Sequence, residues 1–335
     1  MKRYLFAAAL ICAPVAAAAD PSVSDIIDGH ILPRFDALAS TSQDLAQTAQ
    51  QDCDPTSTDL RAAYGAAFDA WISASHLRFG PTEVDDRAFA LAFWPDSRGA
   101  TPRSLATLIA DQDPIAANVE TYSDVSIAAR GFYALEFLLY DATLMQEGTS
   151  DYHCTLVRTV AGDIAATATA IYDDWTGGHA DVLLSPGPTA TYRSEEEVLQ
   201  EMLRALTAGL QFTSDSRLGR PLGTFDRPRP KRAEAWRSGR SASDVKLSLE
   251  SLQDLASRLA VTDPQVAEQL TREFNDALDK LEAVNDPVFA SVAKPQSRLK
   301  IEVVQQAVDT IRTTVQTELG PTLGVAAGFN SLDGD

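Results

Sequence analysis

Hydrophobic residues recur at helical spacing through most of the chain, and no segment of useful length alternates between hydrophobic and polar positions. Spacings of three and four residues place apolar side chains on one face of a helix, whereas a half-buried strand needs a period of two. The pattern therefore predicts an all-α fold built from helical bundles. The predicted helices cover residues 22–50, 58–77, 105–110, 123–141, 151–175, 194–212, 243–259, 263–284 and 296–319.

Turn-forming residues separate these helices. Residues 79–103 and 177–192 are rich in Gly and Pro and are predicted to be long loops. Pro33 interrupts the first helical pattern and is expected to kink that helix, because proline has no N–H to donate. Ser194 is followed three residues later by Glu197, the pattern of a capping box at the start of a helix.

The chain is longer than a single hydrophobic core usually supports, so we expect two domains. The stretch 218–232 is rich in Gly and Pro and is the candidate boundary. The prediction is an N-terminal helical bundle over 20–216 and a C-terminal bundle with a tail over 217–335. An Ala-Trp-x-Ser pattern occurs at 70–73 and again at 235–238, which leaves a duplicated unit as an alternative. Four residues are too few to establish a repeat.

The first 19 residues have the pattern of a Sec-type signal peptide. Lys2 and Arg3 precede an apolar run over 5–15, and small residues lead to a cleavage site near Ala19. No later segment is long and apolar enough to span a membrane, so the mature chain is expected to have no transmembrane segment. The sequence therefore predicts a protein of the periplasm, within the cell envelope.

Cleavage of this signal leaves two cysteines, Cys53 and Cys154. An even number of cysteines in an oxidising compartment is typical of a disulfide. We therefore expect a bridge between them, with two separate buried thiols as the alternative.

The formal net charge of the whole chain is -19. Such an acidic protein is expected to avoid nucleic acid and anionic lipid. The negative charge is compatible with cationic ligands such as metal ions, but a need for solubility is enough to explain the excess of acidic residues. The segment 217–232 is a local exception, because it contains six basic residues. One interpretation is a connector whose arginines pair with neighbouring carboxylates, and the other is a clamp for an anion or a carboxylate.

The helix predicted over 123–141 is strongly apolar and yet carries Glu136. Tyr133 and Tyr140 lie on the same face, at spacings of three and four residues from it. A carboxylate in such an apolar helix is costly unless it meets a partner. We therefore take Glu136 as the centre of the candidate site.

The run from Gly131 to Glu136 resembles the Gly-x-His-x-x-Glu motif of the imelysin family, bacterial envelope proteins described as insulin-cleaving metallopeptidases or iron-regulated proteins. Gly131 and Glu136 match the motif, and Tyr133 stands where the family has His. The resemblance extends through residues 78–81, 93–96, 235–241 and 328–330. It implies two related helical bundles and a role in the cell envelope linked to iron.

A His-x-x-Glu pair on one helical face suits a divalent metal ion, whereas tyrosinate and carboxylate are hard donors that suit ferric iron. The predicted metal ligands are Tyr133, Glu136, His76 and Asp69. The predicted supporting residues are Arg78, Gly131, Arg237 and Arg240. The alternative is that Tyr133 and Glu136 form hydrogen bonds within the bundle core, with Arg78 or Arg130 as partners.

No His-Glu-x-x-His and no Gly-x-Ser-x-Gly motif is present, so the sequence does not favour hydrolysis. The predicted function is non-catalytic binding of a metal ion, iron being suspected, or of a metal-loaded partner in envelope iron handling. The metal is the only cofactor expected. The alternatives are a metallopeptidase of the imelysin type and a metal-free module that binds a periplasmic or outer-membrane protein.

Overall fold

The computed structural model describes residues 21–324, so the predicted signal peptide and the 328–330 segment lie outside the described residues. Within that range the all-α prediction is confirmed. The chain forms helices joined by turns, with an isolated bridge between Thr224 and Arg227 and no β-strand in the part described. Among the same residues, no helix combines the length and the apolar character needed to cross a bilayer.

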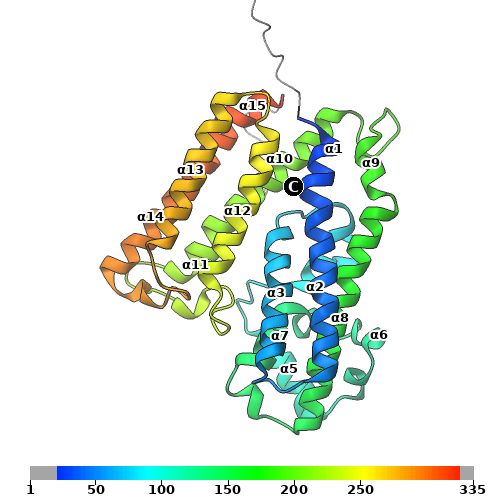
Figure 1. Cartoon of the computed structure of the whole chain (residues 1–335). Helices are drawn as coiled ribbons and strands as arrows, with labels where there is room; N and C mark the ends of the chain where they lie inside the picture. Colours follow the sequence, from blue (N-terminus) through cyan, green and yellow to red (C-terminus); the bar gives the residue numbers. More distant parts are fainter. Residues whose placement is uncertain (1–20, 325–335) are drawn as a thin grey trace, which may run out of the picture.

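The first group of helices is organised around α2 (Leu32–Gln51), which packs against α3 (Thr58–Ala74) and α8 (Ser150–Asp174). The short α1 (Val23–Ile26) extends α2 at its N-terminal end, as Figure 1 shows. The motif helix α7 (Gly131–Tyr140) packs against α8. Apolar stripes from these helices bury their side chains against one another, which is what the helical spacing in the sequence requires.

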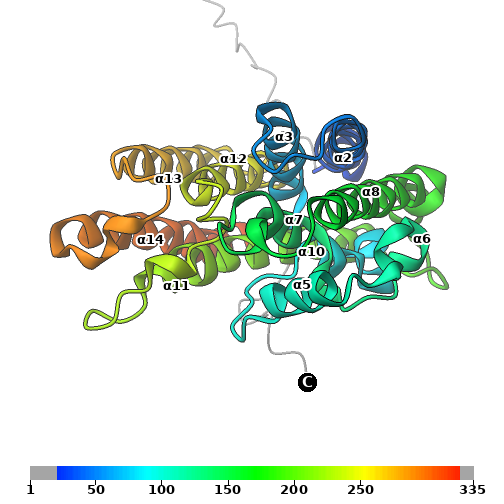
Figure 2. The same cartoon turned by 90° about the horizontal axis from the view of Figure 1, so that it is seen from below.

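The second group contains α10 (Glu195–Gln211), α12 (Ser241–Leu259), α13 (Pro264–Glu282) and α14 (Pro295–Thr314). Helix α10 packs against both α12 and α14, although it precedes the predicted boundary at residue 217. Helix α12 also packs against α3, so it joins the second group to the first (Figure 2). The division into two domains stays a prediction, and the junction between α3 and α12 is where the candidate site lies.

The chain also forms shorter helices: α4 (Arg87–Leu91), α5 (Ala100–Asp111), α6 (Val119–Tyr122), α9 (Ala180–Leu184), α11 (Gly219–Leu222) and α15 (Gly320–Thr322). The prediction of one long loop over 79–103 is wrong in part, because α4 and the start of α5 fall within it. The Asp96 carboxylate accepts the N–H groups of Ala100 and Thr101, and so satisfies the free donors of the first turn of α5.

The motif helix is also shorter than the predicted 123–141. Arg130 has extended backbone angles, φ -105° and ψ 164°, and the helix begins only at Gly131. At the other end, Asp141 is again extended, with φ -83° and ψ 112°. The first predicted helix contains a π-helical turn over Ile27–Ile31, which ends two residues before Pro33. Three further π-helical stretches occur at Trp175–His179, Phe212–Leu218 and Val315–Leu319.

The predicted disulfide is confirmed. Cys53 follows the end of α2, Cys154 lies near the start of α8, and their Cα atoms are 5.2 Å apart. The bridge spans 101 positions in the sequence, and a loop of this length corresponds to roughly 4–5 kcal/mol of stabilisation in the chain-entropy description. The disulfide therefore fixes one end of the α2–α8 pair covalently.

Candidate functional site

Gly131 starts the motif helix in a position that only glycine can occupy. Its φ is +74°, in the left-handed region, and an added Cβ would lie 2.2 Å from the carbonyl oxygens of both Ala90 and Leu91. The end of α4 thus packs directly on the backbone of Gly131. The glycine of the motif therefore sets the close approach of α4 to α7, and its predicted supporting role is a backbone role.

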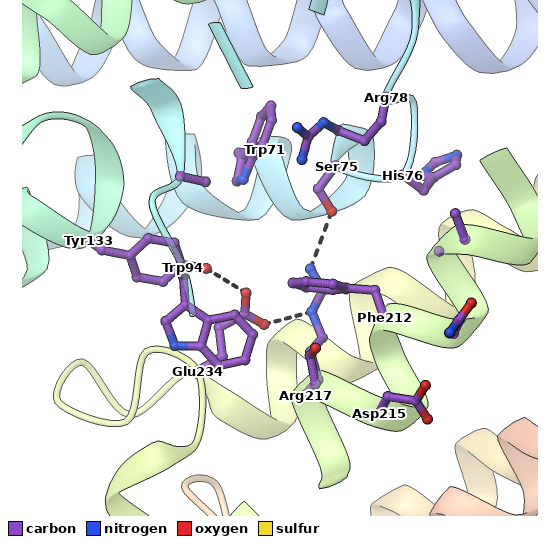
Figure 3. Close-up of a pocket in the computed structure, with 15 residues that line it drawn as sticks. Trp71, Ser75, His76, Arg78, Trp94, Tyr133, Phe212, Asp215, Arg217 and Glu234 are labelled. Carbon is purple, nitrogen blue, oxygen red and sulfur yellow. Dashed lines mark hydrogen bonds and ion pairs between the residues drawn. The ribbon is translucent and has the colours of Figure 1, made fainter. Parts of the chain in front are cut away.

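Tyr133 projects from α7 toward a carboxylate that is distant in the sequence, Glu234. The Tyr133 hydroxyl donates to Glu234 Oε1 at 2.5 Å, and Arg217 Nε donates to Glu234 Oε2 at 2.6 Å. Arg217 also donates through a second nitrogen to Ser75 Oγ at 3.2 Å. Figure 3 shows this chain of contacts, which runs from α7 through the segment before α12 to the π-helical turn after α10 and the end of α3.

The three charged or phenolic side chains of this hydrogen-bonded series are almost fully buried, with exposed fractions of 5% for Tyr133, 2% for Glu234 and 3% for Arg217. Burial raises the pKa of the Tyr133 phenol well above its usual value, and the negative charge of Glu234 raises it further. The phenol therefore holds its proton and acts as a hydrogen-bond donor. Breaking such a buried ion pair by removing one partner leaves an unpaired charge in the protein interior.

A cavity of about 220 Å³ opens beside the hydrogen-bonded side chains of Tyr133, Glu234 and Arg217. We call it the Tyr133 cavity. Trp71, Trp94 and Phe212 form apolar walls, as Figure 3 shows, and Glu234 and Arg217 supply polar groups between them. An apolar pocket with a few convergent polar groups is the usual form of a small-molecule site, although this volume is below the typical range of about 300–1,000 Å³.

Glu136, the centre of the predicted site, faces away from the Tyr133 cavity. Its Oε1 accepts the backbone N–H of Ser238 at 2.9 Å and the Ser238 hydroxyl at 2.8 Å. Burial raises the pKa of Glu136 above its usual value, and the two donors of Ser238 and the charge of Arg237 oppose that change. Glu136 and Tyr133 are thus on one helix but have different partners.

His76 is paired with another histidine. His76 Nε2 lies 2.8 Å from His30 Nε2, and His30 Nδ1 lies 2.7 Å from Asp254 Oδ2. His76 lines the edge of the Tyr133 cavity, and its ring points away from Glu234 in Figure 3. Burial lowers the pKa of His76 well below its usual value, and the neighbouring His30 lowers it further. Both imidazoles are therefore neutral near pH 7.

The other predicted site residues also have partners of their own. Asp69 forms an ion pair with Arg240, Arg78 with Glu83 at 2.5 Å, and Arg237 with Asp141 at 2.9 Å. Arg130, the alternative partner considered for Glu136, pairs with Asp163 at 2.7 Å.

The structure therefore does not bring Tyr133, Glu136, His76 and Asp69 together. Within residues 21–324, no three His, Cys, Asp or Glu side chains form a group that could hold a metal ion. The Tyr133–Glu234 pair does offer two hard oxygen donors, but the Arg217 guanidinium already occupies the cationic position beside Glu234. The donor set thus fits a bare ferric ion poorly. Metal binding by the protein stays a prediction.

Sequence reasoning missed Glu234, Arg217 and His30 as members of these networks. Glu234 is the only acidic residue between Arg227 and Arg240, and an isolated acid in a basic segment was the signal that could have identified it. The role of His30 had no such signal, because its partners, in the turn after α3 and on α12, are remote in the sequence.

Asp244, on the first turn of α12, is a further buried acid near Glu234 and Arg217. Its side chain is fully buried, and neither carboxylate oxygen has a hydrogen-bond partner among the described residues. Burial raises its pKa well above the usual value, and the negative charge of Glu234 adds to this effect. We infer that Asp244 holds its proton, because an ionised carboxylate without donors is strongly disfavoured in an apolar interior.

Comparison with known proteins identifies the family. The profile of the family described as Imelysin matches residues 31–315. Iron-regulated protein A of Synechococcus elongatus is 25% identical over 328 residues, which cover 90% of this chain and 85% of the relative. An imelysin-like protein from Psychrobacter arcticum has a similar structure, with a TM-score of 0.78, 20% identity, and coverage of 92% of this chain and 96% of that one.

A second solved structure, from Parabacteroides distasonis, is described as an iron-regulated protein A precursor. It aligns with a TM-score of 0.74 and 14% identity, over 90% of this chain and 96% of that one. At these identities the two structures establish the shared fold alone. Since the family profile covers well over half of the residues, the chain belongs to the imelysin family.

Proposed function

We propose that this protein is a non-catalytic binding protein of the iron response in the periplasm, and that it recognises an iron-loaded partner molecule through the Tyr133 cavity. The link to iron is supported by the names of two relatives, which are described as iron-regulated. The Cys53–Cys154 disulfide supports an oxidising compartment such as the periplasm.

One observation carries the choice of an organic ligand over a bare ion. Glu234 is held between the Tyr133 hydroxyl and the Arg217 guanidinium, within aromatic walls. A metal ion at Glu234 would have to displace Arg217 or lie beside its positive charge. A hydrogen-bonding group attached to an apolar body meets complementary surfaces in the same place. The volume admits a ring or an amide of a larger molecule.

The same contacts argue against hydrolysis. A metallopeptidase needs a metal with an open position and an activated water beside a base. The residues predicted to provide these, Glu136 and His76, are engaged by Ser238 and His30 instead. Neither is aimed at the Tyr133–Glu234 pair.

Binding of iron in two forms tests the proposal. The purified mature protein is dialysed against the ferric complex of labelled benzohydroxamate, an aromatic ring that carries hydrogen-bonding groups, and separately against ferric iron from a weak donor complex that does not itself bind the protein. Retention of iron together with benzohydroxamate, reduced in Trp71→Leu and Glu234→Gln, is the expected result. Asp163→Asn is the matched control, because that acid is also buried and paired with an arginine, Arg130, but lines neither the Tyr133 cavity nor the pocket that contains Glu136.

Two results contradict the proposal. Iron retained without benzohydroxamate, with a visible tyrosinate–iron band that Tyr133→Phe abolishes, would establish direct metal ligation. Retention of neither form would leave the metal-free interaction module as the better description.

A further inference from the structure

The basic segment 217–232 contains cations that form no ion pair within the part of the chain that the structure describes. Arg217 pairs with Glu234 at 2.6 Å. The other basic residues of the segment form no ion pair with any carboxylate of residues 21–324; they are Arg220, Arg227, Arg229, Lys231 and Arg232. A connector that uses these residues only to pair with neighbouring acids is therefore the wrong interpretation for five of the six. This is unexpected in a chain with a net charge of -19.

Three of these cations line one pocket of about 200 Å³: Arg220, Lys231 and Arg232. We call it the Arg220 pocket. Trp94 and Trp236 form two of its walls. The Arg220 guanidinium lies 5.6 Å from the ring centre of Trp94, and Lys231 Nζ lies 5.6 Å from that of Trp236. The aromatic rings therefore hold the cations in place without neutralising them.

Arg220 has an unused donor. Its Nε is buried and has no hydrogen-bond partner among the described residues. Burial lowers the pKa of Arg220, and the positive charge of Arg232 lowers it further. Two guanidinium groups thus lie close enough to repel each other, and no carboxylate of residues 21–324 forms an ion pair with Arg220.

Two carboxylates also line the Arg220 pocket, but other donors already engage them. Asp96 accepts the backbone N–H groups of Arg98, Ala100 and Thr101. Glu136 accepts both donors of Ser238. A fourth cation of the lining, Arg237, is paired with Asp141. The cationic donors of the pocket that form no ion pair with residues 21–324 are therefore those of Arg220, Lys231 and Arg232.

We propose that the Arg220 pocket binds a small oxyanion with at least two negative charges, a polycarboxylate or a phosphate. Guanidinium groups present paired N–H donors that match carboxylate and phosphate oxygens. The partly buried setting of Arg220 strengthens each contact relative to one in bulk water. The pocket shares Trp94 and Tyr133 with the Tyr133 cavity but uses different charged groups, so the inference does not depend on the proposed function.

Calorimetric titration of the mature, iron-free protein tests this inference, with citrate in one arm and inorganic phosphate in the other, both at low ionic strength. Saturable binding of one anion per chain is expected in at least one arm. Which arm responds identifies the oxyanion as a polycarboxylate or a phosphate. The affinity should fall as salt is added, because salt screens the interaction.

Variants localise the binding. The double variant Arg220→Gln with Arg232→Gln is expected to weaken it by about tenfold or more, the loss typical of charge-assisted hydrogen bonds. Arg227→Gln is the matched control, because Arg227 is equally basic, exposed and outside the lining of the pocket. Should the double variant fail to fold, the exposed Arg232→Gln alone should still weaken the binding.

Glu234→Gln separates this pocket from the Tyr133 cavity, and citrate or phosphate binding should survive in that variant. Three outcomes would overturn the inference. They are no saturable binding of either anion by the wild type, an equal loss in Arg227→Gln, and unchanged binding in the Arg220 and Arg232 variants. The first leaves the pocket without an anion function, and the others assign the binding to diffuse charge.

Discussion

Lowering the pH below neutrality should destabilise the protein through the buried His30. His30 is fully buried, and its pKa is lowered from 6.5 to about 4, chiefly because burial disfavours the imidazolium. The hydrogen bond to Asp254 opposes this change, and the positive charge of Arg34 reinforces it. His30 Nε2 faces His76 Nε2 at 2.8 Å, so only one proton fits between the two rings.

The direction of the change in stability with pH depends on whether the folded or the unfolded state binds the proton more tightly. The unfolded chain takes up a proton at His30 near pH 6.5, whereas the folded protein resists it down to about pH 4. The contribution of His30 to the free energy of unfolding is therefore constant above pH 6.5 and falls as the pH decreases from 6.5 to about 4. At about 1.36 kcal/mol per pH unit, this group alone accounts for a loss of about 3 kcal/mol.

A second acid-sensitive step lies lower. Asp254 has its pKa lowered from 3.8 to about 2 by the hydrogen bond and charge of His30 and by Arg34, against the effect of burial. It therefore contributes stability above pH 3.8 that is lost as the pH falls toward 2. The two steps fall in different pH windows and can be separated.

The assay is urea denaturation from pH 7 to pH 4, compared between the wild type and His30→Gln. Glutamine cannot titrate, so the variant should lose about 3 kcal/mol less over this range than the wild type does. Nuclear magnetic resonance of the imidazole groups gives a direct reading, since the sequence has only four histidines. An ordinary titration of His30 near pH 6.5, or the same pH dependence in the variant, would refute this reasoning.

Gly131→Ala should lower the free energy of unfolding, measured in urea, by about 2–4 kcal/mol, because the alanine would have a strained φ and would clash with backbone carbonyl groups. Gly177→Ala is the control and should be nearly neutral, because nothing lies within 4 Å of the added Cβ. Equal effects of the two substitutions would contradict the packing argument. Reduction of the disulfide should cost roughly 4–5 kcal/mol in the same assay, and an unchanged midpoint would show that the bridge does not stabilise the fold. Glu234→Gln should lower the free energy of unfolding by about 3–5 kcal/mol, because it leaves Arg217 charged and unpaired. The double variant Glu234→Gln with Arg217→Met should recover part of that loss. No recovery would mean that the broken ion pair is not the source of the loss.

Much of the fold could be predicted because it depends on local sequence. Helical periodicity predicted the long helices, and Ser194 accepts the N–H of Glu197 at the start of α10, as the capping pattern requires. Local spacing was less informative at the ends of the motif helix. There the start at Gly131 is set by the carbonyl groups of α4, which belong to a distant segment.

The candidate site could be predicted only in part. The sequence marked Tyr133 and Glu136 as polar groups in an apolar helix, and both are buried and hydrogen-bonded. It did not reveal that their partners are Glu234 and Ser238, about a hundred positions away. The phenol and the carboxylate have different neighbours because Glu234 and Ser238, four positions apart in the turn before α12, both contact α7.

By itself the sequence determined the helical class, the disulfide partners and the presence of polar groups within the core, because periodicity, cysteine number and residue polarity are properties of the chain. The tertiary structure alone decided which charges are neutralised. Arg217 and Arg220 lie three positions apart, yet one is paired with Glu234 and the other faces a pocket with its Nε unpaired. Ion pairing depends on distances of a few ångströms between segments remote in the chain, and only the packing of α12 and its preceding turn against α3 and α7 sets those distances.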